Sequence, residues 1–139
     1  MKLPVTPSFS LQGRRALVAG GSSGIGLGCA VALAEAGAHV VVMARRKDQL
    51  DTVVAAITDA GHSAEALVGD LADIEATLTV IDAIRPLDVF VNSAGMARHS
   101  PATETAADDF DAVMNVNLRG AYFASQAVAK AMIADGRPG

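Results

Sequence analysis

The chain has 139 residues, of which 51% are hydrophobic and 19% are charged, and its formal net charge is -4 at pH 7. This length suits one domain with a substantial core, and the composition excludes an intrinsically disordered protein. The only cluster of basic residues is Arg45, Arg46 and Lys47. We therefore expect no nucleic-acid partner.

The sequence also indicates in which cellular compartment the protein is found. Residues 1–11 contain one lysine and no apolar run of the kind that a signal peptide needs, and no later stretch is apolar enough to span a membrane. The single cysteine, Cys29, has no partner for an internal disulfide. These features predict a cytoplasmic protein without a membrane association.

The chain opens with a predicted strand, turn and helix. Residues 14–20 (RRALVAG) form a short apolar run that ends in glycine, and residues 24–36 carry small and aliphatic side chains at helical spacing. Gly37 stands where a helix normally ends. The side chains that we expect to face a sheet recur every three or four residues: Ile25, Cys29, Leu33 and Ala36.

The same alternation continues along the chain. Strands are predicted at residues 39–44, 64–69 and 87–92, and helices at residues 46–60, 74–84 and 107–134. The first of these strands has no polar alternation, which is typical of a strand covered on both faces. Pro86 separates a helix from a strand, and Gly120 interrupts the last helical stretch, which is either one long helix or two abutting ones. Its apolar side comprises Phe110, Val113, Met114, Leu118, Tyr122 and Val128.

Strands that alternate with helices at this spacing require parallel βαβ units with right-handed crossovers. We therefore predict one α/β domain over residues 1–139, a doubly wound, Rossmann-type parallel sheet with helices on both faces in three αβα layers. Residues 137–139 (RPG) form a turn signal that normally leads into another strand. We expect the sheet to be incomplete after its fourth strand, with an exposed edge and exposed apolar helix faces.

A glycine-rich turn joins the first predicted strand to the first predicted helix. Its glycines permit a tight turn, close approach of a pyrophosphate and close packing of the helix on the sheet. Amide groups at the start of the helix favour an anion, and the serines add hydroxyl donors and candidate helix caps. The predicted phosphate site comprises Gly20, Ser22, Ser23, Gly24, Ile25 and Gly26.

Three segments together resemble the short-chain dehydrogenase/reductase family. The turn has that family's Gly-x-x-x-Gly-x-Gly spacing, with Ala19 where the family has threonine. Residues 92–95 read Asn-Ser-Ala-Gly against the family's Asn-Asn-Ala-Gly, and residues 115–120 read Asn-Val-Asn-Leu-Arg-Gly against Asn-Val-Asn-Leu-x-Gly. The resemblance extends over residues 11–139 and implies a nicotinamide-dependent oxidoreductase.

The resemblance also assigns roles at the ends of the later strands. Asn92, Ala94 and Gly95 would lie against the ribose and nicotinamide side of the cofactor. Asp70, followed by Leu71, would accept a hydrogen bond from the adenine amino group. Because aspartate also caps helices well, an N-cap before the helix that follows is an equally good interpretation of Asp70, and both can hold.

The resemblance places one catalytic residue in this chain. Asn117 matches the asparagine that joins a serine, a tyrosine and a lysine in the family's proton relay, whereas we expect Asn115 to be structural. The serine and the Tyr-x-x-x-Lys pair have no match, because Gln126 stands four residues after Tyr122, the only tyrosine. We expect Tyr122 to pack in the core, and residues 1–139 to be truncated before the catalytic region and inactive alone.

The residues at the end of the second strand indicate whether the cofactor is NAD or NADP. An acidic residue there would bind the ribose hydroxyls of NAD, and a basic one would accommodate the 2′-phosphate of NADP. Ala44 stands in the place of the acid, and Arg45 and Arg46 follow, whose guanidinium groups suit a phosphate. We predict NADP(H) rather than NAD(H).

The complete enzyme is expected to interconvert a small ketone or aldehyde and an alcohol with NADP(H), and to form a homo-oligomer. The competing interpretation is a non-catalytic fragment or module that binds NADP(H). A methyltransferase or a sugar-nucleotide epimerase would use the same fold, but the glycine spacing argues against both. His39, His62 and His99 show no metal-ligand spacing, so we predict no metal; His99 borders a substrate cleft or lies on a surface loop.

Overall fold

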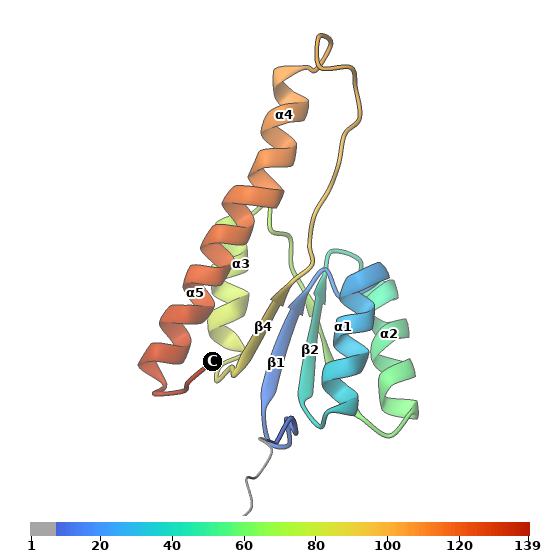
Figure 1. Ribbon diagram of the computed structural model, residues 1–139, viewed down its shortest axis with the longest axis vertical. Helices are drawn as coiled ribbons and strands as arrows, with labels where there is room; N and C mark the ends of the chain where they lie inside the picture. The colour runs from blue at the N-terminus through green and yellow to red at the C-terminus, as the bar shows by residue number, and fades with distance from the viewer. Residues whose placement is uncertain (1–7) are drawn as a thin grey trace, which may run out of the picture.

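The computed structural model describes residues 8–139 and contains a four-stranded parallel sheet in the order β3-β2-β1-β4 (Figure 1). The strands are β1 (Arg15–Ala19), β2 (His39–Ala44), β3 (Ser63–Val68) and β4 (Val89–Asn92). The predicted doubly wound sheet is confirmed. The chain leaves β1 toward β2 and β3 on one side and returns to place β4 on the other, so the strand order reverses at β1. In open α/β sheets, ligands bind outside the carboxyl ends of the strands at such a reversal.

Helices cover both faces of the sheet, which confirms the three predicted layers (Figure 1). Helices α1 (Gly24–Glu35) and α2 (Lys47–Asp59) lie on one face, and α3 (Ile74–Ala83) and α5 (Ala121–Ala134) lie on the other. Strand β2 therefore has buried side chains on both faces. Val40 and Val42 pack toward α1 and α2, and Val41 and Met43 pack toward the other layer.

The predicted inward face of the first helix is only partly right. Cys29 and Leu33 are half-buried and pack against the core, but the fully buried residues of α1 are Gly26, Ala30 and Ala34, and Ile25 is 82% exposed. Because this helix is apolar on nearly every side, periodicity did not identify the centre of the face that meets the sheet. Its smallest side chains face the sheet because the helix starts in close contact with the turn that precedes it.

The predicted last helix is one continuous rod with an irregular centre. Helix α4 (Ala107–Met114) leads into a π-helical segment, η1 (Asn115–Gly120), and then into α5. Gly120 does not break the helix. It is buried, and a Cβ there would lie 2.3 Å from the carbonyl oxygen of Leu71, so the glycine permits close contact with the loop after β3.

The expected core position of Tyr122 is also wrong, because its side chain is 62% exposed. Only part of this rod packs on the sheet, through Ala124, Val128 and Ala131 of α5. Helix α4 extends beyond the carboxyl ends of the strands (Figure 1). The apolar side that was predicted for residues 107–134 is therefore only partly buried.

No helix within residues 8–139 is long and apolar enough to cross a membrane. The prediction that residues 1–11 contain no signal segment falls largely on residues 1–7, which lie outside the described residues.

A buried carboxylate joins three segments at the amino ends of the strands. Asp88, 4% exposed, accepts a 2.8 Å hydrogen bond from the backbone N–H of Arg15 and side-chain hydrogen bonds from Arg14 and Arg137 at 3.1 and 2.7 Å. Burial alone would raise the pKa of Asp88, but these hydrogen bonds outweigh it and hold the pKa below the ordinary value. Asp88 thereby ties the starts of β1 and β4 to the residues after α5.

Replacing Asp88→Asn should lower the free energy of unfolding by about 3 kcal/mol near pH 7, because two arginines lose their buried counter-charge. A carboxyl group with a depressed folded pKa stabilises the fold above its unfolded pKa of about 3.9, and this stabilisation is lost as the pH falls through the folded pKa. The difference between wild type and variant should therefore shrink below about pH 4, as measured by denaturant unfolding.

The matched control is Asp51→Asn, which removes an exposed ion pair with Lys47 on α2. Its effect should stay below about 0.5 kcal/mol. Equal losses in the two variants would contradict a structural role for the buried carboxylate.

Candidate functional site

A cleft opens at the carboxyl ends of the strands, where the four loops that follow β1, β2, β3 and β4 meet. Its volume of about 170 Å³ is below the roughly 300–1,000 Å³ that is usual for small-molecule pockets. The cleft can therefore enclose only part of a large ligand, and the rest would lie along the open surface. The lining residues are Gly20, Ser22, Ser23, Met43, Ala44, Arg45, Arg46, Gly69, Asp70, Leu71, Ser93, Ala94, Gly95, Met96 and Val116.

The glycine turn at the floor of the cleft has no room for side chains. Gly20 has a φ of +76°, and a Cβ there would lie 2.6 Å from the backbone nitrogen of Ala94. A Cβ on Gly26 would lie 2.2 Å from the carbonyl oxygen of Gly20. The start of α1, the turn after β1 and the loop after β4 are thus in backbone contact, as the glycine spacing predicts.

The start of α1 is not capped by a side chain. Ser23 occupies the N-cap position with extended backbone, but it makes no capping hydrogen bond, and the first turn contains no acidic residue. The predicted capping role of the serines is therefore wrong. The amide groups of a first helical turn have no partner within the helix, so those of α1 are available to an anion.

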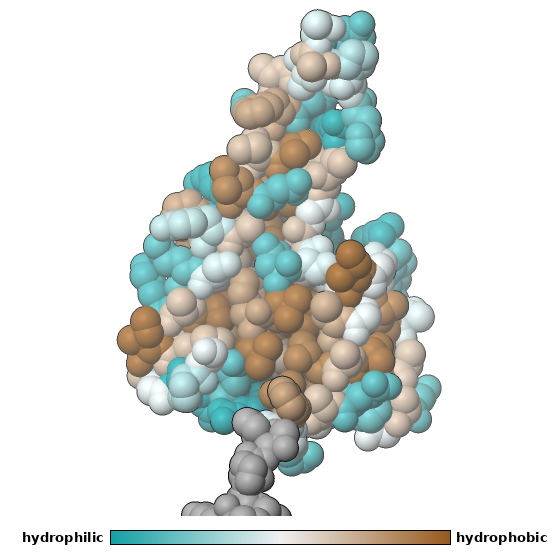
Figure 2. All heavy atoms as spheres, in the orientation of Figure 1, coloured by the Kyte–Doolittle hydropathy of each residue, from teal (hydrophilic) through white to brown (hydrophobic). Residues whose placement is uncertain are grey.

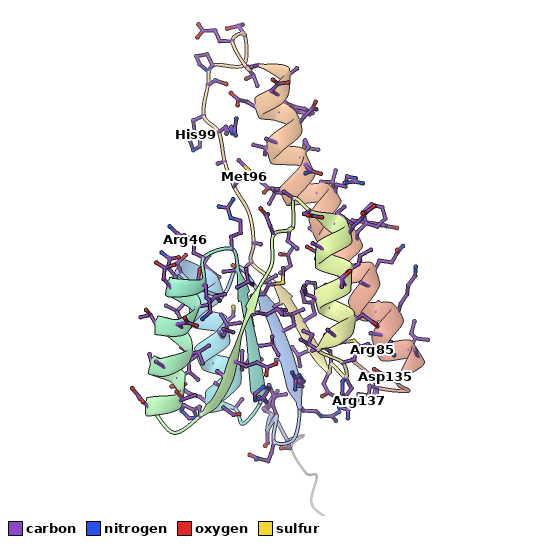
Figure 3. All side chains as sticks on the ribbon, turned by 180° about the vertical axis from the view of Figure 1, so that it is seen from behind. Arg46, Arg85, Met96, His99, Asp135 and Arg137 are labelled. Atoms are coloured by element: carbon purple, nitrogen blue, oxygen red, sulfur yellow. The ribbon has the colours of Figure 1, made fainter. Side chains whose placement is uncertain are left out.

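Two arginines form one wall of the cleft. Arg45 and Arg46 follow β2, are exposed, and form no ion pair within residues 8–139, whereas the neighbouring Lys47 pairs with Asp51. Figure 3 shows Arg46 at the end of the sheet from which α4 rises. Arg45, Arg46 and the N-cap Ser23 of α1 line the same cleft, and this arrangement favours a ligand with more than one anionic group.

Asp70 and Leu71 also line the cleft. The Asp70 carboxylate accepts a 3.0 Å hydrogen bond from the backbone N–H of Ala72, so it shapes the turn after β3. It does not cap α3. That N-cap is Asp73, whose side chain accepts from the N–H of Ala76, so the N-cap interpretation of Asp70 is wrong.

The loop after β4 supplies the opposite wall. Ala94 and Gly95 line the cleft, whereas Asn92 does not. The Asn92 side chain instead accepts a 3.1 Å hydrogen bond from the backbone N–H of Ala94 and holds the loop in place.

Asn117 does not line the cleft but holds Met96, which does. Its Oδ1 accepts a hydrogen bond from the backbone N–H of Met96, and its Nδ2 donates one to the carbonyl oxygen of Met96, both at 2.8 Å. Asn117 lies within the π-helical segment η1, and such segments are frequent at functional sites. Asn115, on the same segment, donates to the carbonyl oxygen of Ala72 and does not contact Met96.

The structure brings most of the predicted residues together but not all of them. Gly24, Ile25, Gly26, Asn92 and Asn117 do not line the cleft. Sequence reasoning missed several residues that do, namely Met43, Gly69, Ser93, Met96 and Val116. They lie within one or two residues of the predicted strand ends and motifs, so the position after each strand was the signal that could have identified them.

The loop beyond Met96 leaves the cleft. Arg98 forms an ion pair with Asp109 of α4, and His99 is exposed (Figure 3). Because His99 does not line the cleft, the surface-loop interpretation of His99 is the one that the structure supports.

Residues 14–139 match the family model described as short chain dehydrogenase. The chain is 43% identical over 131 residues to L-xylulose reductase of Mesocricetus auratus, covering 94% of this chain and 52% of that protein. It is 40% identical over 133 residues to gluconate 5-dehydrogenase of Gluconobacter oxydans (strain 621H), covering 93% and 52%.

The crystal structure of a gluconate 5-dehydrogenase from Burkholderia cenocepacia J2315, in complex with NADP and tartrate, superposes with a TM-score of 0.87 at 39% identity. That match covers 94% of this chain and 53% of the other. The chain spans about half the length of the relatives that it matches.

Two glycines of α1 provide a matched test of the turn. Gly26→Ala should lower the free energy of unfolding by about 3 kcal/mol, because the new methyl group overlaps the Gly20 carbonyl. Gly28→Ala should raise it by about 0.5–1 kcal/mol, because a Cβ there meets nothing within 4 Å and alanine favours a helix. Urea unfolding measures both, and effects of the same sign would refute the contact described here.

Proposed function

The chain belongs to the short chain dehydrogenase family, and we propose that it is the cofactor-binding part of an NADP(H)-dependent oxidoreductase that interconverts a ketone or aldehyde and an alcohol. When bound, the nicotinamide would give or take the hydride. The observation that carries the proposal is that Ser23, the N-cap of a helix without a side-chain cap, lines the same cleft as two arginines without ion pairs in the described part of the chain.

The residues present fit a dinucleotide. Gly20 and Gly26 let the start of α1 lie against the turn after β1, and the amides of residues 24–26, which no side chain caps, would be available to a pyrophosphate. Ser22 and Ser23 offer hydroxyl groups at the same wall. Ile25, which is exposed and outside the cleft, would contribute its backbone amide alone.

The other predicted residues would hold the remaining parts of the cofactor. Asp70 and Leu71 would border the adenine, and Ala94 and Gly95 would border the ribose and nicotinamide side. Asn92 supports this wall through its hydrogen bond to the N–H of Ala94, rather than by lining the cleft.

Selection of NADP(H) over NAD(H) rests on the residues that follow β2. Ala44 offers no carboxylate to the ribose hydroxyls, and Arg45 and Arg46 line the cleft beside it. Guanidinium groups bind phosphate through paired hydrogen bonds and keep their charge at neutral pH. The gluconate 5-dehydrogenase structure that contains NADP is consistent with this choice.

Asn117 is proposed to support proton transfer as a positioning residue. Its amide holds both backbone groups of Met96 at the edge of the cleft. By the family resemblance it would join a serine, a tyrosine and a lysine that have no match in these residues. Tyr122 is exposed on the helix and has Gln126 four residues later, so it does not supply that tyrosine.

The names of the relatives suggest the substrate class. L-xylulose reductase and gluconate 5-dehydrogenase act, by name, on small sugar-derived molecules. We propose a polyhydroxylated ketone, or the corresponding alcohol, as substrate of the whole protein. The full gene product should oxidise NADPH when a ketose such as L-xylulose is added. Saturable NADPH binding without oxidation across a panel of ketoses and keto acids would favour a non-catalytic binding module.

Removing both arginines should change cofactor preference. Arg45→Ala combined with Arg46→Ala should weaken NADPH binding by about 10-fold or more, because charge-assisted hydrogen bonds to the 2′-phosphate are lost. The dissociation constant for NADH should change by less than about 2-fold. Fluorescence titration of the full gene product measures both constants.

Lys47→Ala is the control for general loss of positive charge, since Lys47 is exposed, adjacent and outside the cleft. It should leave the ratio of the two constants unchanged. A parallel loss of NADPH and NADH affinity in the double variant would contradict a 2′-phosphate site.

Replacing Asn117→Asp retains an acceptor for the Met96 N–H and removes the donor to its carbonyl oxygen. We expect kcat to fall by about 100-fold with little change in the dissociation constant for NADPH. Asn115→Ala, which loses a hydrogen bond from the same helical segment to Ala72, should reduce stability and leave kcat within about 3-fold of wild type. Equal kinetic losses would mean that Asn117 only stabilises the helix.

A further inference from the structure

Thr77 is a buried polar residue on the inner side of α3. Figure 2 shows polar residues over the outer surfaces of the helices, where water can solvate them. The Thr77 side chain is only 2% exposed, and within residues 8–139 Asp88 is the one other buried polar side chain. A buried hydroxyl group costs free energy unless it finds a hydrogen-bond partner, and valine would fill the same space without that cost. The partner of Thr77 therefore indicates what its hydroxyl group does.

The Thr77 hydroxyl group donates out of its own helix. Its Oγ1 lies 2.8 Å from the carbonyl oxygen of Asp70, in the loop after β3. Thr79, exposed on the same helix, instead donates to the carbonyl oxygen of Glu75, one turn earlier. Thr77 thus ties α3 to the loop whose residues Asp70 and Leu71 line the cleft.

Asp70 is held through both its backbone and its side chain. Its carbonyl oxygen accepts from Thr77 and, at 2.9 Å, from the backbone N–H of Asp73. One carboxylate oxygen, Oδ1, accepts from the N–H of Ala72. The other, Oδ2, forms no hydrogen bond within residues 8–139. Because a carboxylate oxygen can only accept, Oδ2 suits a ligand group that donates.

Packing fixes the rest of this loop. Leu71 is 3% exposed, and the long helical rod lies on its carbonyl oxygen at Gly120, where no side chain intervenes. The loop is thus enclosed between α3 and the rod. Within this arrangement, the Thr77 hydrogen bond sets the position of Asp70 relative to α3.

We propose that Thr77 is a positioning residue for adenine recognition, because its hydroxyl group holds Asp70 where the carboxylate can accept a hydrogen bond from the adenine amino group. This rests on the proposed cofactor site, in which Asp70 borders the adenine. Hypoxanthine carries a carbonyl oxygen in place of that amino group, so the carboxylate would face a second acceptor. A site that hydrogen-bonds a ligand group discriminates against an analogue that lacks it. The wild-type protein should therefore bind NADPH more tightly than the same dinucleotide with hypoxanthine.

Removing the hydroxyl group tests this role in the full gene product. Thr77→Val should raise the dissociation constant for NADPH by about 5-fold and that for the reduced hypoxanthine dinucleotide phosphate by less than about 2-fold. The preference for adenine should fall accordingly. Thr77→Ser keeps the donor and should retain the preference. Fluorescence titration measures both constants, and urea unfolding verifies the fold, which should persist because the Asp70 carbonyl oxygen keeps its bond from Asp73.

Thr79→Val is the matched control, since it removes an exposed hydroxyl group that bonds only within α3. It should leave both constants within about 2-fold of wild type. An equal loss for the two dinucleotides in Thr77→Val, or a wild type without preference, would overturn the proposal. A wild type that binds neither dinucleotide would refute the cofactor site itself, so the two failures are distinguishable.

A second substitution tests whether Thr77 acts through Asp70. Asp70→Asn retains an acceptor for the Ala72 N–H and places a donor at the free position, which suits the carbonyl oxygen of hypoxanthine. The preference should therefore reverse, and Thr77→Val in this background should shrink the reversed preference. If Thr77→Val still weakened NADPH binding more than binding of the hypoxanthine form, Thr77 would not act through Asp70 and the proposal would be wrong.

Discussion

The contact between Gly26 and the Gly20 carbonyl is the constraint on which the cleft depends. It lets the first turn of α1 lie directly on the backbone of the turn after β1, and Gly20 lets that turn lie on the loop after β4. A methyl group at either place would overlap backbone atoms that cannot move without shifting a strand or a helix. The absence of two side chains thus brings three segments into contact and leaves the start of α1 open to an anion.

The two ends of the sheet differ in whether their charged side chains form ion pairs. At the amino ends of the strands, Asp88 is buried and forms ion pairs with Arg14 and Arg137. At the carboxyl ends, Arg45 and Arg46 line a cleft without a carboxylate partner among the described residues. Paired charges stabilise the fold, whereas charges left without partners beside uncapped helix amides are available to a ligand. This division supports the proposal that the carboxyl ends hold the cofactor.

The order and type of the elements, the parallel sheet and most of the cleft could be predicted, because apolar spacing and glycine positions report local geometry directly. The face of α1 could be predicted only in part, since an apolar helix with small side chains has no polar side to orient it. Tyr122 was misplaced because the predicted periodicity could not show that α4 extends beyond the sheet. Ser23 and Asp70 were assigned capping roles from residue type alone, and the actual partners depend on backbone geometry. The hydrogen bonds between Asn117 and Met96 could not be predicted either, because they depend on the path of the loop after β4.

We propose that the start of α1 and the two arginines bind the phosphates of NADP(H). The most direct measurement is an NMR titration of the isotope-labelled protein with 2′,5′-ADP, compared with 5′-AMP. Saturable shifts are expected at the amides of residues 24–26 and at residues 45–46, with tighter binding of 2′,5′-ADP. Shifts elsewhere in the chain, or equal affinity for the two nucleotides, would contradict it.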